Sequence, residues 1–274
     1  MLKFMTMPTL GFSPCPNDTF IFYALANRVI DMRGFDFELH IEDVETLNRQ
    51  AIARSLDVTK ISCHAFHHVQ DDYRFLRSGG AFGRGCGPLV VSKHGYEPGD
   101  LKGKSIAIPG ALTTAYLLLK LFFDATFDVR PDRVEPMLFS EIPAAVRDGS
   151  VDAGLIIHES RFTYAEYGLS KVLDLGEWWE KETGLPIPLG GIVAKKTLGP
   201  SVESIENLIR ESVEYSLGHR EEAMPFIGKY SQELSEPVIN SHIGLYVNDF
   251  TIDMGDEGAA SLQELLRRAQ KADS

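Results

Sequence analysis

The sequence is poor in cysteine and holds no long apolar run, and each shortage excludes a class of protein. Its 274 residues include three cysteines, at positions 15, 63 and 86, with no CxxC pair. Such an odd, sparse set neither forms a disulfide framework nor has the spacing of zinc ligands. No stretch of about 18 apolar residues is present, so we expect no transmembrane helix. The first residues lack the apolar core and cleavage site of a secretory signal, which predicts a reducing, cytoplasmic location.

Basic residues are also scarce. Lys and Arg number 27 against 39 Asp and Glu, and the formal net charge is −12. A net acidic surface repels phosphate backbones and anionic lipid, so we expect neither a nucleic acid nor a membrane as a partner. The chain also lacks the GxxxxGK[ST] and GxGxxG loops of nucleotide sites and the GxSxG turn of serine hydrolases.

We expect no metal requirement. His64 and His68 stand four residues apart on a predicted helix, a spacing that lets two imidazoles share an ion. The cluster, which includes His67, lacks the Glu of an HExxH helix and has no third ligand of suitable spacing. A helix surface accounts for these histidines more simply.

Short apolar runs alternate with segments of helical spacing along the chain. Val58–Ser62, Ser105–Ile108 and Ala153–Ile157 are predicted strands, and Thr113–Phe123 is a strongly apolar predicted helix. From Ser201 onward the spacing is mostly helical. This order predicts an α/β protein with helices on the faces of mixed or parallel sheets.

Two such α/β units followed by helices predict a two-lobed α/β fold with a ligand cleft between the lobes. We expect residues 1–91 and 193–274 to form a discontinuous large lobe, and residues 92–192 to form an inserted small lobe. Glycines at both crossings, within 85–87 and 190–191, are compatible with hinge motion. One continuous doubly wound sheet is the alternative.

Polar residues follow two of the predicted strands, at the end of a strand where ligands bind in open α/β sheets. Asn17 and Asp18 come after a turn with two prolines, and they are expected to cap the next helix. A tight capped turn alone would explain them equally well. Lys60 and Ser62 flank Ile61 and point to one side, where an ammonium and a hydroxyl form a site for a carboxylate or hydroxyl. A solvated strand end is the alternative there.

Thr113 and Thr114 open a predicted helix directly after a strand and a Pro-Gly turn. A helix N-terminus supplies unpaired N–H groups and the positive end of the helix dipole, so two hydroxyls beside it complete an anion site. Capping of the helix by one threonine is the simpler alternative.

His158 is the best general acid or base among the eight histidines. It follows the apolar strand Ala153–Ile157 and stands beside Glu159 and Arg161. Imidazole titrates near ~6.5, so it is mostly neutral at working pH and accepts a proton readily. Cys15 is not expected to be a nucleophile, because no nearby basic group lowers its pKa.

Several long, ungapped strings of residues carry a resemblance to one family. They are GFSPCPNDTFIFYAL (11–25), EDVETLNR (42–49), RSGGAFGRGCGPLVV (77–91), TTAY (113–116) and AGLIIHESRFTY (153–164). They are similar to those of the 1,4-dihydroxy-6-naphthoate synthases, the lyases of the futalosine route to menaquinone. The similarity continues through GEWWEKETGLPIPLG (176–190) into the C-terminal helices and covers nearly the whole chain.

The resemblance implies a periplasmic-binding-protein type II fold and the conversion of cyclic dehypoxanthinyl futalosine to 1,4-dihydroxy-6-naphthoate without a cofactor. It implies that His158, in the string LIIHES, is the catalytic base. The expected contacts to a small substrate with a carboxylate are Lys60, Ile61, Ser62, Thr113 and Thr114, with Asn17 and Asp18 at the same site.

Two other functions stay open. A chorismate dehydratase would have the same fold and pathway, although the string HESRFTY favours the synthase. A solute-binding protein for small carboxylates would also share the fold, but the missing signal peptide counts against it.

Overall fold

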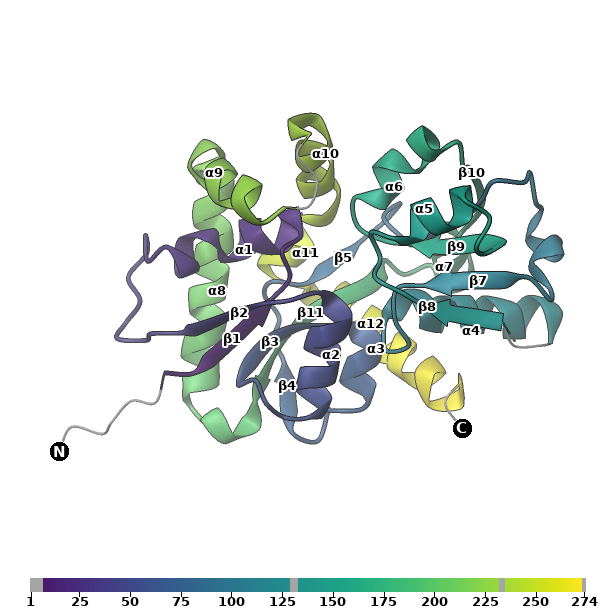
Figure 1. The fold of residues 1–274 in the computed structure, drawn as a ribbon. Helices are drawn as coiled ribbons and strands as arrows, with labels where there is room; N and C mark the ends of the chain where they lie inside the picture. The colour runs from purple at the N-terminus through teal and green to yellow at the C-terminus, as the bar shows by residue number, and fades with distance from the viewer. Residues whose placement is uncertain (1–6, 129–132, 232–234, 273–274) are drawn as a thin grey trace.

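The computed structural model describes residues 7–128, 133–231 and 235–272, and it contains two separate β-sheets side by side (Figure 1). The first sheet has the strand order β2-β1-β3-β11-β4, with β5 also paired to β11, and the second has the order β10-β6-β9-β7-β8. One continuous sheet is therefore excluded, and the two-lobed α/β prediction is confirmed. The strands of the first sheet are Thr9–Phe12 (β1), Glu38–Ile41 (β2), Val58–Ser62 (β3), Tyr73–Phe75 (β4), Ala81–Gly83 (β5) and Ile187–Lys195 (β11). Those of the second are Leu89–Ser92 (β6), Ser105–Ile108 (β7), Arg133–Pro136 (β8), Ala153–Ile156 (β9) and Ser170–Asp174 (β10).

Each sheet combines parallel and antiparallel pairs. In the first sheet β1 is parallel to β2 and β3, whereas β11 runs antiparallel to β3, β4 and β5. In the second sheet β7 is parallel to β8 and β9, whereas β6 runs antiparallel to β9 and β10. The candidate segments of the sequence all lie at or just after the carboxyl ends of four strands, β1, β3, β7 and β9. This is where open α/β sheets bind ligands.

Helices cover both sheets. Ser212 of α8 ties this helix to α1, because its hydroxyl donates to the carbonyl of Ile21 (2.6 Å) and accepts from the N–H of Leu25 (3.1 Å). Around the first sheet lie Pro16–Ala26 (α1), Val44–Ile52 (α2), Cys63–His67 (α3), Ser201–Gly218 (α8), Arg220–Tyr230 (α9), Glu236–Tyr246 (α10) and Asp249–Ile252 (α11). Thr114–Phe127 (α4), Ile142–Arg147 (α5), Ser160–Thr163 (α6) and Leu175–Thr183 (α7) lie around the second, and single 3₁₀ turns span Pro98–Leu101, Tyr164–Tyr167 and Lys196–Leu198.

The last helix, Gly255–Ala272 (α12), bridges the two sheets. It packs against α3 beside the first sheet and against α4 beside the second, and it is the yellow helix of Figure 1. Its residues Leu262 and Leu265 share one apolar cluster with Leu118 and Phe122 of α4. Among the described helices, none is long and apolar enough to cross a membrane.

The strand pairing bears on where the chain crosses between the lobes. β6 pairs within the second sheet and β11 within the first, whereas the sequence prediction had divided the chain at 91/92 and 192/193. Helix α7 packs on α4 and β6. We therefore propose that the chain crosses at residues 84–88 and 184–186.

The glycines expected at a hinge have a packing role. Gly191 lies inside β11, and a Cβ there would fall 2.0 Å from the ring of Phe75. A Cβ at Gly87 would fall 2.2 Å from the Cα of Gly176, since the two backbones touch. Close approach therefore explains the glycine at both positions, and hinge motion stays a prediction.

Candidate active site

One pocket collects every site residue that the sequence predicts. Its empty space is about 640 Å³, part of it open to solvent, and it is lined from both sheets. The predicted residues in its wall are Asn17, Asp18, Lys60, Ile61, Ser62, Thr113, Thr114 and His158. Others in the wall include Ser13, Cys86, Leu189, Gly190 and Tyr246.

A buried ion pair forms one side of the pocket. The ammonium of Lys60 lies 2.6 Å from Oδ1 of Asp18 and 3.2 Å from the carbonyl of Gly79. Oδ2 of Asp18 accepts from the N–H (3.2 Å) and hydroxyl (2.7 Å) of Ser13. Both charged side chains are at most 5% exposed. The pair is therefore a buried, hydrogen-bonded element of the wall.

The expected role of Asn17 and Asp18 as helix caps is wrong. Helix α1 begins at Pro16 with Cys15 at its N-cap, so both residues lie in its first turn. The Asp18 carboxylate is directed back to Ser13 and Lys60 instead. This arrangement arises because Pro16, which has no N–H to satisfy, is well suited to the first position of a helix.

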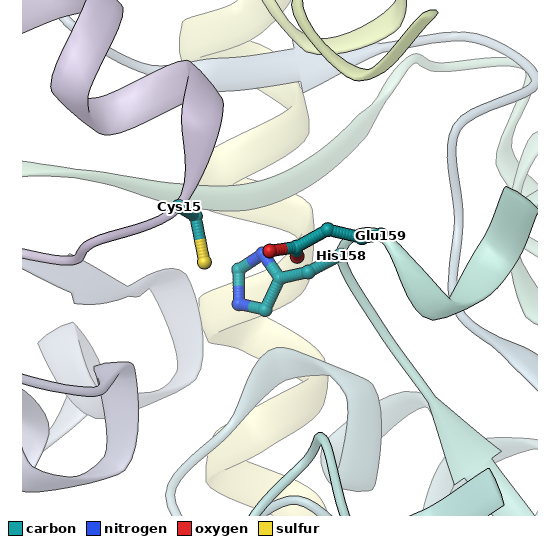
Figure 2. Close-up of side chains that lie close together, drawn as sticks. All are labelled: Cys15, His158 and Glu159. Atoms are coloured by element: carbon teal, nitrogen blue, oxygen red, sulfur yellow. The ribbon is translucent and has the colours of Figure 1, made fainter. Parts of the chain in front are cut away.

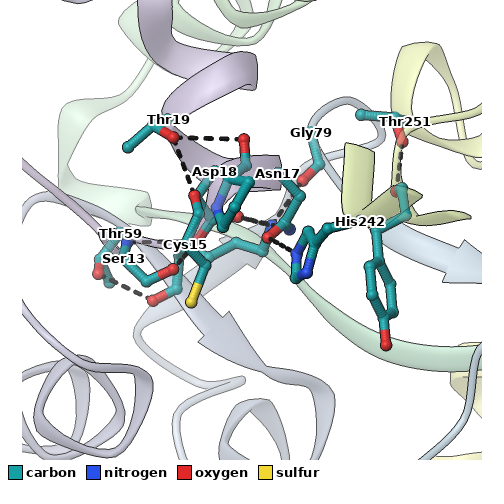
Figure 3. Close-up of polar contacts among 12 residues, drawn as sticks. Ser13, Cys15, Asn17, Asp18, Thr19, Thr59, Gly79, His242 and Thr251 are labelled. Carbon is teal, nitrogen blue, oxygen red and sulfur yellow. Dashed lines mark hydrogen bonds and ion pairs between the residues drawn. The ribbon is translucent and has the colours of Figure 1, made fainter. Parts of the chain in front are cut away.

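No local sequence pattern indicated His242, a fully buried residue of α10. Its Nε2 lies 3.0 Å from Oδ1 of Asn17, and Nδ2 of Asn17 donates to Asp18 (3.0 Å; Figure 3). A carboxylate only accepts, so the amide orientation is fixed and His242 must donate from Nε2. Its Nδ1 is then an acceptor without a partner among the described residues. Burial, followed by the positive potential of His158 and Lys60, lowers the pKa of His242 well below its usual value.

His158 faces the pocket from the end of β9. Its backbone is left-handed, with φ at 54°, a conformation that costs energy outside glycine and concentrates at functional sites. Its ring packs edge-on to Phe139 with centroids 5.0 Å apart, and stacks with His242 at 6.2 Å. Burial is the main cause that lowers the pKa of His158 to about 4; the negative charge of Asp18 opposes this shift and the positive charge of Lys60 adds to it. The expectation of a barely shifted imidazole is therefore wrong, and the ring is neutral over a wider pH range.

Arg161 secures the loop that carries His158. Its guanidinium donates to the carbonyls of Gly85 (2.9 Å) and Gly87, and it pairs with Asp174 at 2.9 Å. Gly85 and Gly87 lie in the proposed crossing segment 84–88. The arginine of the string HESRF thus ties the crossing to the loop of the candidate base.

The two threonines use their hydroxyls within the protein. Thr113 accepts from the N–H of Tyr116 (3.2 Å) and donates to the carbonyl of Gly110 (2.8 Å), so it is the N-cap of α4. The hydroxyl of Thr114 donates to the carbonyl of Leu189 (2.7 Å). An anion bound here would therefore contact those N–H groups at the start of α4 that the cap by Thr113 does not use.

A buried carboxylate joins the two sheets beside these threonines. Glu45 of α2 accepts from the N–H of Leu112 at 3.3 Å, in the turn that leads into α4. A Cβ at Gly110 would fall 2.4 Å from this carboxyl group. Burial raises the pKa of Glu45. A side chain at position 110 would therefore displace this carboxyl group, and the backbone φ of 151° there also favours glycine.

Comparison with known proteins now adds to this geometry. A profile of a menaquinone biosynthesis family matches residues 8–271. The chain belongs to this family. It is 48% identical over 264 residues to a 1,4-dihydroxy-6-naphthoate synthase of Thermus thermophilus, covering 95% of this chain and 93% of that protein. It is 45% identical over 262 residues to a 1,4-dihydroxy-6-naphthoate synthase of Streptomyces coelicolor, and the match covers 95% of this chain and 92% of that protein.

Solved structures place the fold of this family member. A crystal structure of a protein from Archaeoglobus fulgidus is 40% identical, with a TM-score of 0.88, and covers 96% of this chain and 97% of its own. A Candida albicans protein with the generic periplasmic-binding-protein fold has a TM-score of 0.71 at 11% identity. The match covers 97% of this chain and 91% of that protein. The predicted periplasmic-binding-protein-like fold is confirmed.

Proposed function

We propose that the protein is a 1,4-dihydroxy-6-naphthoate synthase, a carbon–carbon lyase that acts on cyclic dehypoxanthinyl futalosine in the cytoplasm. The observation that carries the proposal is the neutral, half-buried imidazole of His158 in a pocket lined from both sheets. The close relatives named as this synthase support it.

The proposed reaction needs a proton acceptor and stabilisation of charge. Release of an aromatic naphthalenediol requires removal of a proton, and aromatisation supplies driving force. Neutral His158 accepts this proton, and a positioned base contributes about 10²–10⁴-fold in rate. The negative charge of Asp18 favours the imidazolium that forms. N–H donors near the pocket stabilise developing negative charge on a substrate oxygen, and closure around the substrate excludes water.

The substrate carboxylate is proposed to bind at the N-terminus of α4. We expect Thr113→Val to raise KM more than it lowers kcat, because the lost cap loosens the first turn and its N–H groups. The effect corresponds to about 1–2 kcal/mol. Thr113→Ser keeps the hydroxyl and is the matched control. Steady-state kinetics of both variants decide the point, and an unchanged KM in Thr113→Val would place the carboxylate elsewhere.

The function is tested by one set of incubations. The purified protein is mixed with cyclic dehypoxanthinyl futalosine, and the product is identified by mass and by naphthalene absorbance. Formation of 1,4-dihydroxy-6-naphthoate supports the proposal. Dehydration of chorismate in a parallel incubation would favour the dehydratase. Binding without turnover of either compound would favour a solute-binding protein.

A further inference from the structure

Three side chains with metal-binding atoms meet beside the pocket. Sγ of Cys15, a ring nitrogen of His158 and a carboxylate oxygen of Glu159 all lie within 4.8 Å of one another (Figure 2). Cys15 and Glu159 are buried, whereas His158 is half-buried and lines the pocket. The group is therefore largely enclosed, and it faces the pocket through His158.

We propose that Cys15, His158 and Glu159 bind one thiophilic divalent cation, best matched by Zn²⁺, and that the ion inhibits the enzyme. A set of one sulfur, one nitrogen and one oxygen donor suits Zn²⁺ and disfavours Mg²⁺ or Ca²⁺, which prefer oxygen alone. A thiolate and a carboxylate balance the double positive charge. Three protein ligands leave a fourth tetrahedral position open toward the pocket for water.

The three ligand atoms lie slightly farther apart than the ligands of a tetrahedral Zn²⁺ ion. Tetrahedral Zn²⁺ with bonds of about 2.0–2.3 Å separates its ligand atoms by roughly 3.3–3.6 Å. The three atoms lie within 4.8 Å of one another, so the side chains must turn inward as they bind the ion.

The unloaded protein holds Cys15 as a thiol. Burial, followed by the negative charges of Glu159 and Asp18, raises the pKa of this thiol well above its usual value. The hydrogen bond with Ser13 and the positive charge of Lys60 lower the pKa by less. A metal ion must therefore displace a proton as it binds. Once bound, the ion occupies a lone pair of the His158 ring, so that nitrogen can no longer accept a proton from the substrate. This inhibition rests on the proposed function, whereas binding of the ion does not.

Cobalt reports on the site without any enzyme assay. Metal-free protein is titrated with Co²⁺, whose thiolate complexes absorb in the near ultraviolet. We expect a band that saturates at one ion per chain, disappears in Cys15→Ser, persists in the pocket-lining control Cys86→Ser and is displaced by Zn²⁺. No band, or a band lost only in Cys86→Ser, would overturn the site. Glu159→Gln, expected to weaken binding at least about tenfold, replaces Cys15→Ser should that variant not fold.

Activity then tests the inhibition. Exhaustive chelation is expected to leave the wild type fully active, and Zn²⁺ to inhibit it until chelator is added back. Cys15→Ser is expected to need at least about tenfold more Zn²⁺ for the same inhibition. Equal sensitivity of the two proteins would overturn the inhibitory role. A wild type that binds Co²⁺ but turns over no substrate would contradict the proposed function and leave the metal site standing.

Discussion

His158→Gln is expected to lower kcat by at least about 10²-fold while the variant folds and still binds substrate. Glutamine keeps much of the size and hydrogen bonding of the side chain but accepts no proton at working pH. The pKa of His158, lowered to about 4 by burial, keeps the wild-type base neutral well below pH 6.5. The wild-type rate should therefore stay nearly constant from neutral pH to about pH 5, and decline only as the imidazole gains a proton. Single-turnover rates across this range measure both effects.

The control for this variant is His94→Gln, at an exposed position, which should leave the rate unchanged. Stability gives a second check with a defined sign. The folded state resists protonation of His158 that the unfolded chain accepts near 6.5, so this residue costs stability as pH falls from about 6.5 to about 4. His158→Gln should lose less stability than the wild type across that window. A folded His158→Gln protein with near-normal turnover would contradict the role of base.

Lys60→Met is expected to destabilise the protein by about 3–5 kcal/mol. The substitution leaves the buried carboxylate of Asp18 without the ammonium that lies 2.6 Å away. Bonds from Ser13 and Asn17 offset part of this loss. Urea denaturation of both proteins measures the difference in free energy of unfolding.

The chain provides a matched control for Lys60→Met. Lys195 pairs with Asp57 at 3.0 Å, but both side chains are at least 21% exposed, so Lys195→Met should cost no more than about 1 kcal/mol. Adding Asp18→Asn to Lys60→Met should recover stability, since no buried charge is then left unpaired. A loss below about 1 kcal/mol for Lys60→Met would show that the buried pair does not support the fold.

The meeting of the candidate residues was predictable from sequence for a geometric reason. Asp18, Lys60, Thr113 and His158 lie at or just after the ends of different strands, and strand order alone brings such ends together when a cleft separates two sheets. The resemblance of the strings to one family indicated the same residues. Both arguments use only local sequence patterns, which can be recognised without knowing how the chain packs.

Other features depend on contacts that no local pattern records. His242 reaches Asn17 across 225 positions of sequence, and it lies in a helix whose spacing marks it only as buried. The shifted pKa of His158 results from burial by distant segments. The hydroxyl of Thr114 bonds to Leu189, which removes it from the anion site that its position beside a helix N-terminus indicated. Tertiary packing decides each of these.

Chemical rescue of His158→Gly tests the central claim most directly. The left-handed backbone at this position, with φ at 54°, suits glycine, so the variant should fold and leave a space for free imidazole beside the substrate. We predict that the variant binds cyclic dehypoxanthinyl futalosine but turns it over at least about 10²-fold more slowly. Added imidazole should restore product formation with a saturating dependence on its neutral form. A folded variant that binds substrate and is not rescued, or that needs no rescue, would contradict the assignment of His158 as the base.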